Sequence, residues 1–382
     1  MTPSDRARAL VESWEEELRR ELPENPRLFD AHTHLGDDID GMVGSYDELT
    51  STLDRYGFES AFVFCMDEHD REPAFTVPND RTLAHADRSQ GRLIPFVRLD
   101  LTTRPLEEAK RCLDLGARGI KLHPRAQAFA LDDERLQPIF ALAVERAVPI
   151  LIHGGRGLPP IAEHLEALVE RNEGVQLIVA HAGIDDMAGL AGRLGGRPGV
   201  FFDTSVWSSL DLLDLHRQVS PQQVLYASDY PYGRQPNSLL VSVRTAKLAG
   251  FDDKQLRLML GGSARRIAER RELEPLSAPK GPTSLVQPLT FARIHQYISM
   301  AVPLLWLRQR DAIGAIGLAV NASRERGNGH PEESERIQEL LMTAQELWRD
   351  CAELEDDERV RTFRAAIQLV NLADMVSLTT RA

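Results

Sequence analysis

Residues 27–35, RLFDAHTHL, join a short apolar run to two histidines that are two positions apart. Side chains two apart on a strand project from the same face, so His32 and His34 are expected to point the same way. Two neutral imidazoles on one side are good ligands for a borderline divalent cation. The alternative for such a pair is two histidines satisfied by hydrogen bonds in a polar interior.

Further apolar runs follow along the chain, and most are continuously hydrophobic rather than alternating, as is typical of parallel strands buried on both faces. These runs are 60–66, 92–99, 117–122, 149–153, 175–181, 200–205 and 224–229. The clearest helical segments between them are 46–56, 104–115, 133–146 and 161–171. With the first run, eight strands alternating with helices predict an α/β fold, a (β/α)₈ barrel. An open, doubly wound sheet is the alternative.

The rest of the chain is predicted to be helical. An amphipathic helix at 4–21 precedes the first strand, and one or two helices after the last strand end near residue 269. Prolines interrupt residues 271–288, which favours a linker, and only helical patterns follow, strongest at 331–351 and 355–375. The predicted regions are an N-terminal helix (1–26), a barrel (27–270), a linker (271–288) and an all-helical C-terminal region (289–382). This tail either mediates dimerisation or caps its own barrel.

Charge and composition exclude some classes of partner. The net charge of −13 repels nucleic acid and anionic membranes, so neither is expected as a partner. No apolar run reaches the roughly 18–20 residues of a membrane span. Three separated cysteines argue against a disulfide framework, and the first twenty residues lack the apolar core of a secretory signal. We therefore expect a cytoplasmic protein.

Polar residues gather where the predicted strands end. His32, His34, His123, His153 and His181 all lie at or just past such ends, which in a barrel form the face where active sites occur. Asp229 also ends an apolar strand, where a carboxylate is costly unless it is paired or bound to a cation. As a ligand it could also accept a proton from water. The alternatives are a helix N-cap for Asp229 and, for His181, a hydrogen bond near the ligands rather than direct ligation.

The order of these motifs resembles the amidohydrolase superfamily. They are DAHTHLG (30–36), GIKLHP (119–124), ILIHGG (150–155), VAHAG (179–183) and ASDYP (227–231). They are most similar to the amidohydrolase-related branch that includes aminocarboxymuconate semialdehyde decarboxylase and related lactone hydrolases. The resemblance covers about residues 27–270 and ends in LMLGGSARRI, whereas the tail from about residue 289 departs from the family pattern.

The resemblance implies a distorted (β/α)₈ barrel and a divalent metal, usually Zn²⁺. Carried over residue by residue, the ligands are His32, His34, His153 and Asp229. The histidine of the sixth strand, here His181, usually orients the attacking water or polarises the substrate.

Lys121 and His123 in GIKLHP leave a second metal open. Members of the superfamily with two metals use a carboxylated lysine on this strand as a bridging ligand. Lys121 could instead form a salt bridge with a substrate carboxylate, or pair with a neighbouring acid.

Arginines after three of the strands favour an acidic substrate. Arg125, Arg156 and Arg234 would overhang the mouth of the barrel, and arginine binds carboxylates in a bidentate fork. The alternative is that these loop arginines pair with surface acids. Trp207, just past the seventh strand, could line the pocket or pack under a helix.

These inferences favour a metal-dependent hydrolase of a lactone, amide or similar carbonyl compound, a small molecule carrying a carboxylate. The metal would activate water and polarise the carbonyl, while Asp229 moves the proton. Non-hydrolytic decarboxylation on the same scaffold is the alternative. A second alternative is a non-catalytic barrel whose helical tail is the interacting part.

Overall fold

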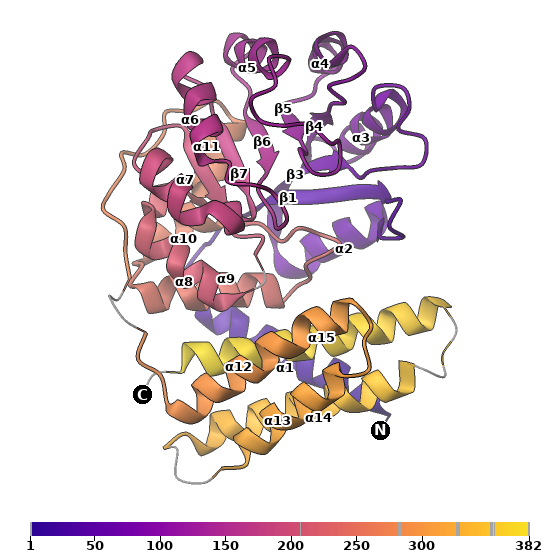
Figure 1. Ribbon diagram of the computed structural model, residues 1–382, viewed down its shortest axis with the longest axis vertical. Helices are drawn as coiled ribbons and strands as arrows, with labels where there is room; N and C mark the ends of the chain where they lie inside the picture. The colour runs from indigo at the N-terminus through magenta and orange to yellow at the C-terminus, as the bar shows by residue number, and fades with distance from the viewer. Residues whose placement is uncertain are drawn as a thin grey trace.

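Eight parallel strands surround a central axis in this computed structural model, which describes residues 2–206, 208–281, 285–325, 329–351, 354 and 356–380 (Figure 1). The strands are β1 (Leu28–Asp37), β3 (Phe58–Cys65), β4 (Leu93–Arg98), β5 (Gly119–Leu122), β6 (Ile150–His153), β7 (Leu177–Ala180), β8 (Val200–Asp203) and β9 (Val224–Leu225). A short strand, β2 (Val43–Gly44), pairs antiparallel with the end of β1. Each of the eight predicted apolar runs overlaps one of the parallel strands.

Backbone hydrogen bonds between β1 and the residues after β9 close the sheet. The N–H of Ala31 donates to the carbonyl of Tyr226 (3.0 Å), and the N–H of His34 donates to that of Tyr230 (2.8 Å). Between them, the N–H of Asp229 donates to the carbonyl of His32 (3.0 Å). The predicted barrel is therefore confirmed, and the open sheet is wrong.

Helices form a layer outside the ring. They are α2 (Tyr46–Tyr56), α3 (Thr76–Arg88), α4 (Pro105–Asp114), α5 (Leu136–Glu145), α6 (Ala162–Arg171), α7 (Met187–Leu194), α8 (Ser209–Gln218) and α9 (Asn237–Ala249), with short turns η1 (His181–Asp186) and η2 (Pro221–Gln223). The helix predicted at 46–56 has these bounds because the Ser45 side chain caps its start and Gly57, at φ 75°, ends it. Phenylalanines of β1, β3, β4 and β8 fill the ring below the site.

After β9, where one or two helices were expected, α9 is followed by three short segments. They are α10 (Asp253–Arg257), η3 (Leu258–Gly262) and α11 (Ser263–Ala268). The break comes at Gly261, where η3 passes close to β1. A Cβ there would lie 2.3 Å from the carbonyl oxygen of Arg27, so only glycine permits the approach.

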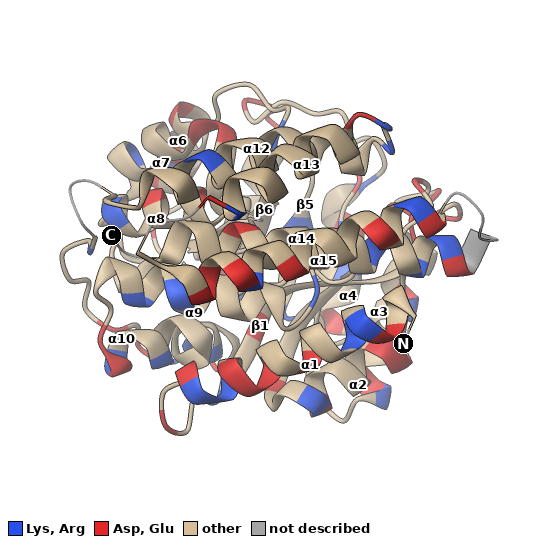
Figure 2. Ribbon diagram, turned by 90° about the horizontal axis from the view of Figure 1, so that it is seen from below, with Lys and Arg blue, Asp and Glu red and all other residues tan. Residues whose placement is uncertain are grey.

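The tail packs against its own barrel. Residues 271–281 and 285–288 form no helix or strand, and α12 (Leu289–Trp306), α13 (Ala312–Ser323), α14 (Pro331–Asp350) and α15 (Asp356–Thr379) follow. Helix α15 contacts α8 and α9 of the barrel, and the N-terminal helix α1 (Pro3–Glu21) contacts α9, α14 and α15. Figures 1 and 2 show α1 running beside the tail helices beneath the barrel.

A single hydrophobic cluster continues from the barrel through α1 into the tail. Trp14 of α1 is 1% exposed. The guanidinium groups of Arg244 from α9 and Arg336 from α14 lie 5.0 and 3.8 Å from its ring centre. Glu17, one turn along α1, pairs with both arginines. The N-terminal helix therefore links barrel and tail through packing, cation–π contacts and ion pairs.

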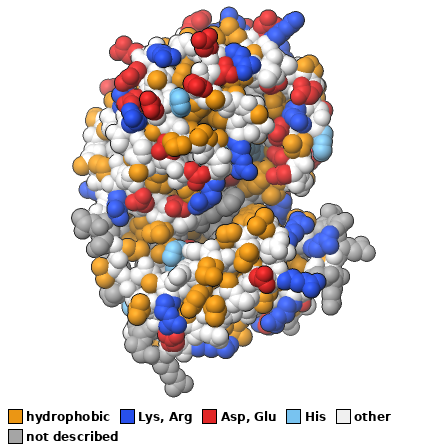
Figure 3. Space-filling model, in the orientation of Figure 1, with side chains coloured by type: hydrophobic (Ala, Val, Ile, Leu, Met, Phe, Trp, Pro, Cys, Tyr) orange, Lys and Arg blue, Asp and Glu red, His pale blue; other side chains and the backbone are white. Residues whose placement is uncertain are grey.

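The outer face of the tail carries exposed apolar side chains. Leu289, Met300, Leu307 and Leu318, on or next to α12 and α13, are each at least 47% exposed, and apolar side chains gather on this face in Figure 3. Dimerisation through the tail stays a prediction. In the described part of the chain, no helix is both long and apolar enough to cross a membrane.

Replacing Trp14 tests this linkage. Trp14→Ala removes a buried indole from between two guanidinium groups, so we expect the free energy of unfolding to fall by about 3–5 kcal/mol. Urea unfolding followed by circular dichroism measures this value. The control is Leu289→Ala, which trims a side chain that is 78% exposed and should change stability by less than about 0.5 kcal/mol. Equal stability of the two variants would show that α1 does not hold the regions together.

Candidate active site

Three buried donor atoms meet at the carboxyl end of the barrel. The Nε2 atoms of His32 and His34 lie 3.1 Å apart, and Oδ1 of Asp229 lies 3.3 Å from the first and 3.2 Å from the second. Donor atoms bound at about 2.0–2.1 Å to one tetrahedral zinc ion lie about 3.3 Å from one another. The spacing of this trio therefore fits a divalent cation at its centre.

The environment of His32 directs a lone pair at that centre. Its Nδ1 lies 2.8 Å from Oδ2 of Asp203, so Nδ1 carries the proton and Nε2 is left free. Burial, together with the charge of Lys121, lowers the pKa of His32 to about 3, against the opposing attraction of Asp203. His32 is therefore neutral, which is the form that binds metals.

Asp203 is the residue that orders this side of the site. Although burial tends to raise its pKa, interactions with His32, His181 and Ser205 lower that pKa below the usual range of a carboxyl group. Its Oδ1 accepts hydrogen bonds from the backbone N–H groups of His181 (2.8 Å) and Ser205 (3.1 Å) and from the Ser205 hydroxyl (2.5 Å). Asp203 therefore orients His32 through Oδ2 and the start of η1, at His181, through Oδ1.

His153 and His181 form a second pair beside the trio. Nε2 of His181 lies 3.1 Å from Nδ1 of His153, and the His181 ring centre lies 5.1 Å from that of His32. Nδ1 of His181 contacts the carbonyl (3.2 Å) and hydroxyl (2.9 Å) oxygens of Ser205. A carbonyl can only accept, so Nδ1 carries the proton and Nε2 keeps a lone pair. A Cβ on Gly155 would lie 2.6 Å from Cε1 of His153, so a larger residue would displace that ring.

The backbone of Asp229 adopts a left-handed conformation, with φ 59°. This geometry costs a non-glycine residue roughly 1–2 kcal/mol. The backbone N–H of Asp229 donates to the carbonyl of His32, and the carbonyl of Asp229 accepts from the N–H of Tyr232 (2.8 Å). Burial and the negative charge of Asp203 raise the pKa of Asp229, against the attraction of Lys121. An ionised carboxylate here is thus costly without a cation. Asp229 is not a helix N-cap, because α9 starts after Pro236.

Two buried cations lie next to these residues. Nζ of Lys121 has no hydrogen-bond partner and lies 4.6 Å from the ring centre of Phe64. Burial lowers the pKa of Lys121 to about 7, despite Asp203 and Asp229. Arg98 ends β4 in register with Lys121, and its Nε and Nη2 also lack partners. An anion would satisfy both side chains.

Of the remaining predicted residues, His123 lies against His153, and the three arginines contact neighbouring segments. His123 stacks on His153 with ring centres 3.8 Å apart, while its Nδ1 accepts from the N–H of Ala126 (3.2 Å). The exposed Arg125 donates to the carbonyl of Arg156 (3.0 Å), and Arg156, also exposed, lies 3.8 Å from Asp185 and 3.6 Å from Asp211. Arg234 pairs with Glu48 at 3.0 Å. Trp207 lies outside the described residues.

Sequence reasoning missed Asp203, Arg98 and Asp30. Asp203 carries the same signal as Asp229, a carboxylate at the end of an apolar strand, and could have been found by it. Arg98 ends a predicted strand in the same way. Asp30 lies two residues before His32 on β1. Its Oδ1 accepts hydrogen bonds from the backbone N–H groups of His32 (3.2 Å) and Ser228 (2.9 Å), and these bonds connect β1 to the chain after β9.

Solved structures of other proteins share the fold of this chain. The fold matches the apo form of IDCase from Metarhizium anisopliae, with a TM-score of 0.50 at 16% identity over 64% of this chain and 97% of that one. It also matches 4-oxalomesaconate hydratase from Rhodopseudomonas palustris, with a TM-score of 0.49 at 17% identity over 64% of this chain and 96% of that one. At these identities the likeness concerns the fold alone. No curated protein matches the chain.

The sequence itself carries a stronger finding. A family model described as Amidohydrolase matches residues 29–267, which include the trio, the His153–His181 pair, Lys121 and Asp203. The matched segment is more than half of the chain and spans the ring of strands. The chain therefore belongs to the amidohydrolase family.

Proposed function

We propose that this protein is a metal-dependent hydrolase that cleaves a lactone, an amide or a similar carbonyl compound bearing a carboxylate. The observation that carries the proposal is the trio of His32, His34 and Asp229, whose donor atoms lie 3.1–3.3 Å apart. One of these atoms, Nε2 of His32, is left with a lone pair by the bond from Nδ1 to Asp203. Such convergence is unfavourable in an empty interior and favourable around a divalent cation.

The trio and His153 hold the metal in this proposal, and we propose Zn²⁺ because imidazole and carboxylate donors suit it. When bound, the ion polarises a carbonyl group and makes an oxygen nucleophile available at neutral pH. Asp229 takes the proton from the attacking water and delivers it to the leaving group. His181, whose Nε2 lies 3.1 Å from Nδ1 of His153, orients the water or the substrate.

Lys121 and Arg98 favour a substrate that carries a carboxylate. Both are buried cations with unsatisfied donor atoms beside the proposed ligands. A carboxylate at this point would offset their burial through charge-assisted hydrogen bonds. The same two cations would also hold the carboxylate of a substrate for decarboxylation, which is the second reaction that we consider. Release of CO₂ without incorporation of solvent oxygen would identify it.

The metal is the first quantity to measure. We expect about one divalent ion per chain in the purified protein by elemental analysis, and turnover of at least one compound in a screen of lactones, amides and unsaturated carboxylates. His32→Ala deletes a ligand, so it should lose both metal and turnover. The control is His164→Ala, which removes an exposed histidine of α6 and should keep both. Wild-type protein that neither carries zinc nor takes it up would refute the proposal.

The roles of Asp229 and His181 can be separated. Asp229→Asn keeps an oxygen donor but removes the base, so we expect turnover to be lost and metal binding to weaken only in part. His181→Ala should keep the metal and lose roughly 10²–10⁴-fold in rate, the range for one positioned acid–base group. His153→Ala should lose the metal. Parallel metal and rate measurements test all three. Full activity of Asp229→Asn would exclude it as the proton carrier, and loss of metal from His181→Ala would make His181 a ligand.

Asp203→Asn tests the control of the His32 tautomer. The amide has nearly the same shape but no charge, so it leaves His32 a weaker ligand. We expect metal affinity to fall roughly 10–100-fold, as is usual when the partner of a ligand histidine is removed. Competition with a chelator measures this affinity, and the thermal unfolding curve shows whether the variant is folded. The matched control is Asp214→Asn, at a partly exposed carboxylate of α8. Unchanged affinity in folded Asp203→Asn would remove Asp203 from this role.

A further inference from the structure

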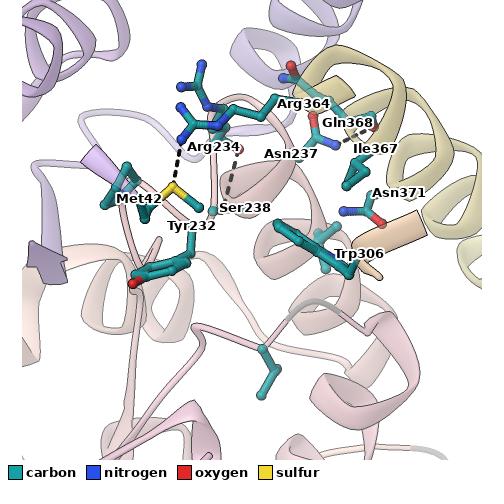
Figure 4. Close-up of a pocket in the computed structure, with 14 residues that line it drawn as sticks. Met42, Tyr232, Arg234, Asn237, Ser238, Trp306, Arg364, Ile367, Gln368 and Asn371 are labelled. Atoms are coloured by element: carbon teal, nitrogen blue, oxygen red, sulfur yellow. Dashed lines mark hydrogen bonds between the residues drawn. The ribbon is translucent and has the colours of Figure 1, made fainter. Parts of the chain in front are cut away.

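A pocket lies where the tail meets the catalytic end of the barrel (Figure 4). The barrel supplies Met42 from the loop after β1, Val206 from the loop after β8, and residues 231–234 from the loop after β9. The tail supplies Trp306 of α12 and residues 364, 367, 368 and 371 of α15. We call this the tail pocket. Its two walls therefore come from segments more than 60 residues apart in the sequence.

The tail pocket adjoins the proposed metal ligands. Tyr232, in its wall, is three residues past Asp229, and its ring meets that of His34 edge to face with centres 5.9 Å apart. Val206 directly follows Ser205, whose oxygens contact the His181 ring. Tyr232 thus belongs both to the wall of the pocket and to the surroundings of the trio.

The charges in the tail pocket have one sign. Among its lining residues are two arginines, Arg234 and Arg364, and no acid, in a chain with a net charge of −13. Figure 4 shows both guanidinium groups at one end of the pocket, with Met42 and Tyr232 on one side and Trp306 on the other. An aromatic wall and a cationic end together suit a flat anion.

The arginines are incompletely satisfied. Arg364 donates to the thioether sulfur of Met42 at 2.6 Å, and sulfur is a weak acceptor. Arg234 gives one nitrogen to Glu48, but its Nε is buried without a partner. Asn237 is 7% exposed, and its amide nitrogen donates to the carbonyl of Gln368 (2.6 Å). Its Oδ1 has no partner.

Two arginines at contacts between α1 and the tail, outside the tail pocket, differ from Arg364 because each forms an ion pair with a glutamate of the protein. Arg6 of α1 pairs with Glu346 of α14 at 3.0 Å, and Arg336 of α14 pairs with Glu17 of α1. Those contacts match a cation with a carboxylate from the protein itself. At Arg364 the place of the carboxylate is taken by a thioether, so among the described residues its guanidinium has no ion-pair partner.

We propose that the tail pocket binds the carboxylate of a small planar organic anion, with Arg364 and Arg234 on the carboxylate and Trp306 and Tyr232 along the flat faces. The tail is then part of the substrate-binding wall, and Arg364 is a specificity residue that holds a second carboxylate of the substrate, apart from the one placed on Lys121 and Arg98. The role of Arg364 in substrate recognition rests on the proposed function, whereas the binding of the anion to the tail pocket does not.

Binding of benzoate to the full-length protein tests the site directly. Benzamide, of the same shape but uncharged, is the control ligand, and isothermal titration calorimetry measures both affinities. We expect benzoate to bind at least about tenfold more tightly than benzamide, and Arg364→Gln to lose about tenfold or more in benzoate affinity. Arg361→Gln, at an exposed arginine of the same helix, should keep wild-type affinity. Absence of benzoate binding, or equal affinity in wild type and Arg364→Gln, would overturn the proposal.

A second variant separates this site from the metal ligands. His32→Ala should bind benzoate within about twofold of wild type, because His32 does not line the tail pocket. If His32→Ala loses the affinity and Arg364→Gln keeps it, the carboxylate binds at the trio and the tail pocket is excluded. For any substrate found in the screen, Arg364→Gln should raise KM with kcat and metal content unchanged. An unchanged KM would leave Arg364 outside substrate recognition even if the metal-dependent reaction is established.

Discussion

The carboxylate of Asp203 connects three strands of the barrel at the point where the chemistry is proposed. It ends β8, bonds to His32 on β1 and bonds to the backbone that follows β7. Burying an ionised carboxylate costs several kcal/mol, and a hydrogen bond to a charged group returns only about 1.5–3 kcal/mol. Asp203 therefore needs all of its bonds, to His32, His181 and Ser205, to be stable as an anion.

This arrangement depends on the closure of the ring. His32 and Asp203 come from strands on either side of β9, so they face each other only because the chain after β9 pairs with β1. Asp30 reinforces the closure from below by accepting from the backbone of both segments. The same closure fixes Asp229, whose N–H is bonded to His32. The positions of the proposed metal ligands His32 and Asp229 therefore depend on the hydrogen bonds that close the barrel.

Much of the barrel could be predicted from the sequence, because its signals are local. Apolar runs locate the strands, and polar residues at their ends collect at one face. The bonds of His32 and His181 are different, since they join residues far apart in the chain. The position of Asp203 at a strand end could have been read from the sequence, but its bond to His32, about 170 positions away, could not. The loop arginines Arg125 and Arg156 were expected over the mouth; Arg125 bonds to the carbonyl of Arg156, and Arg156 lies near Asp185.

The tail was the least predictable part. Helical periodicity gives the helices but not the surface on which they pack, so the approach of Arg364 to the loop after β9 could not be inferred from the sequence. Nor could the position of Trp14, which needs both α9 and α14 to be in place. In both cases the information lies in contacts between segments that are distant in the sequence.

The position of α1 has a consequence for the way in which this chain reaches its native state. Trp14 and Glu17 contact residues of α14, more than 300 positions later in the sequence, as well as α9 of the barrel. During synthesis this helix emerges early, yet its apolar face cannot be fully covered until the last helices have formed. Contacts of such long sequence separation slow folding and leave hydrophobic surface open to association with other chains. The docking of α1 therefore requires both α9 of the barrel and α14 of the tail to be in place.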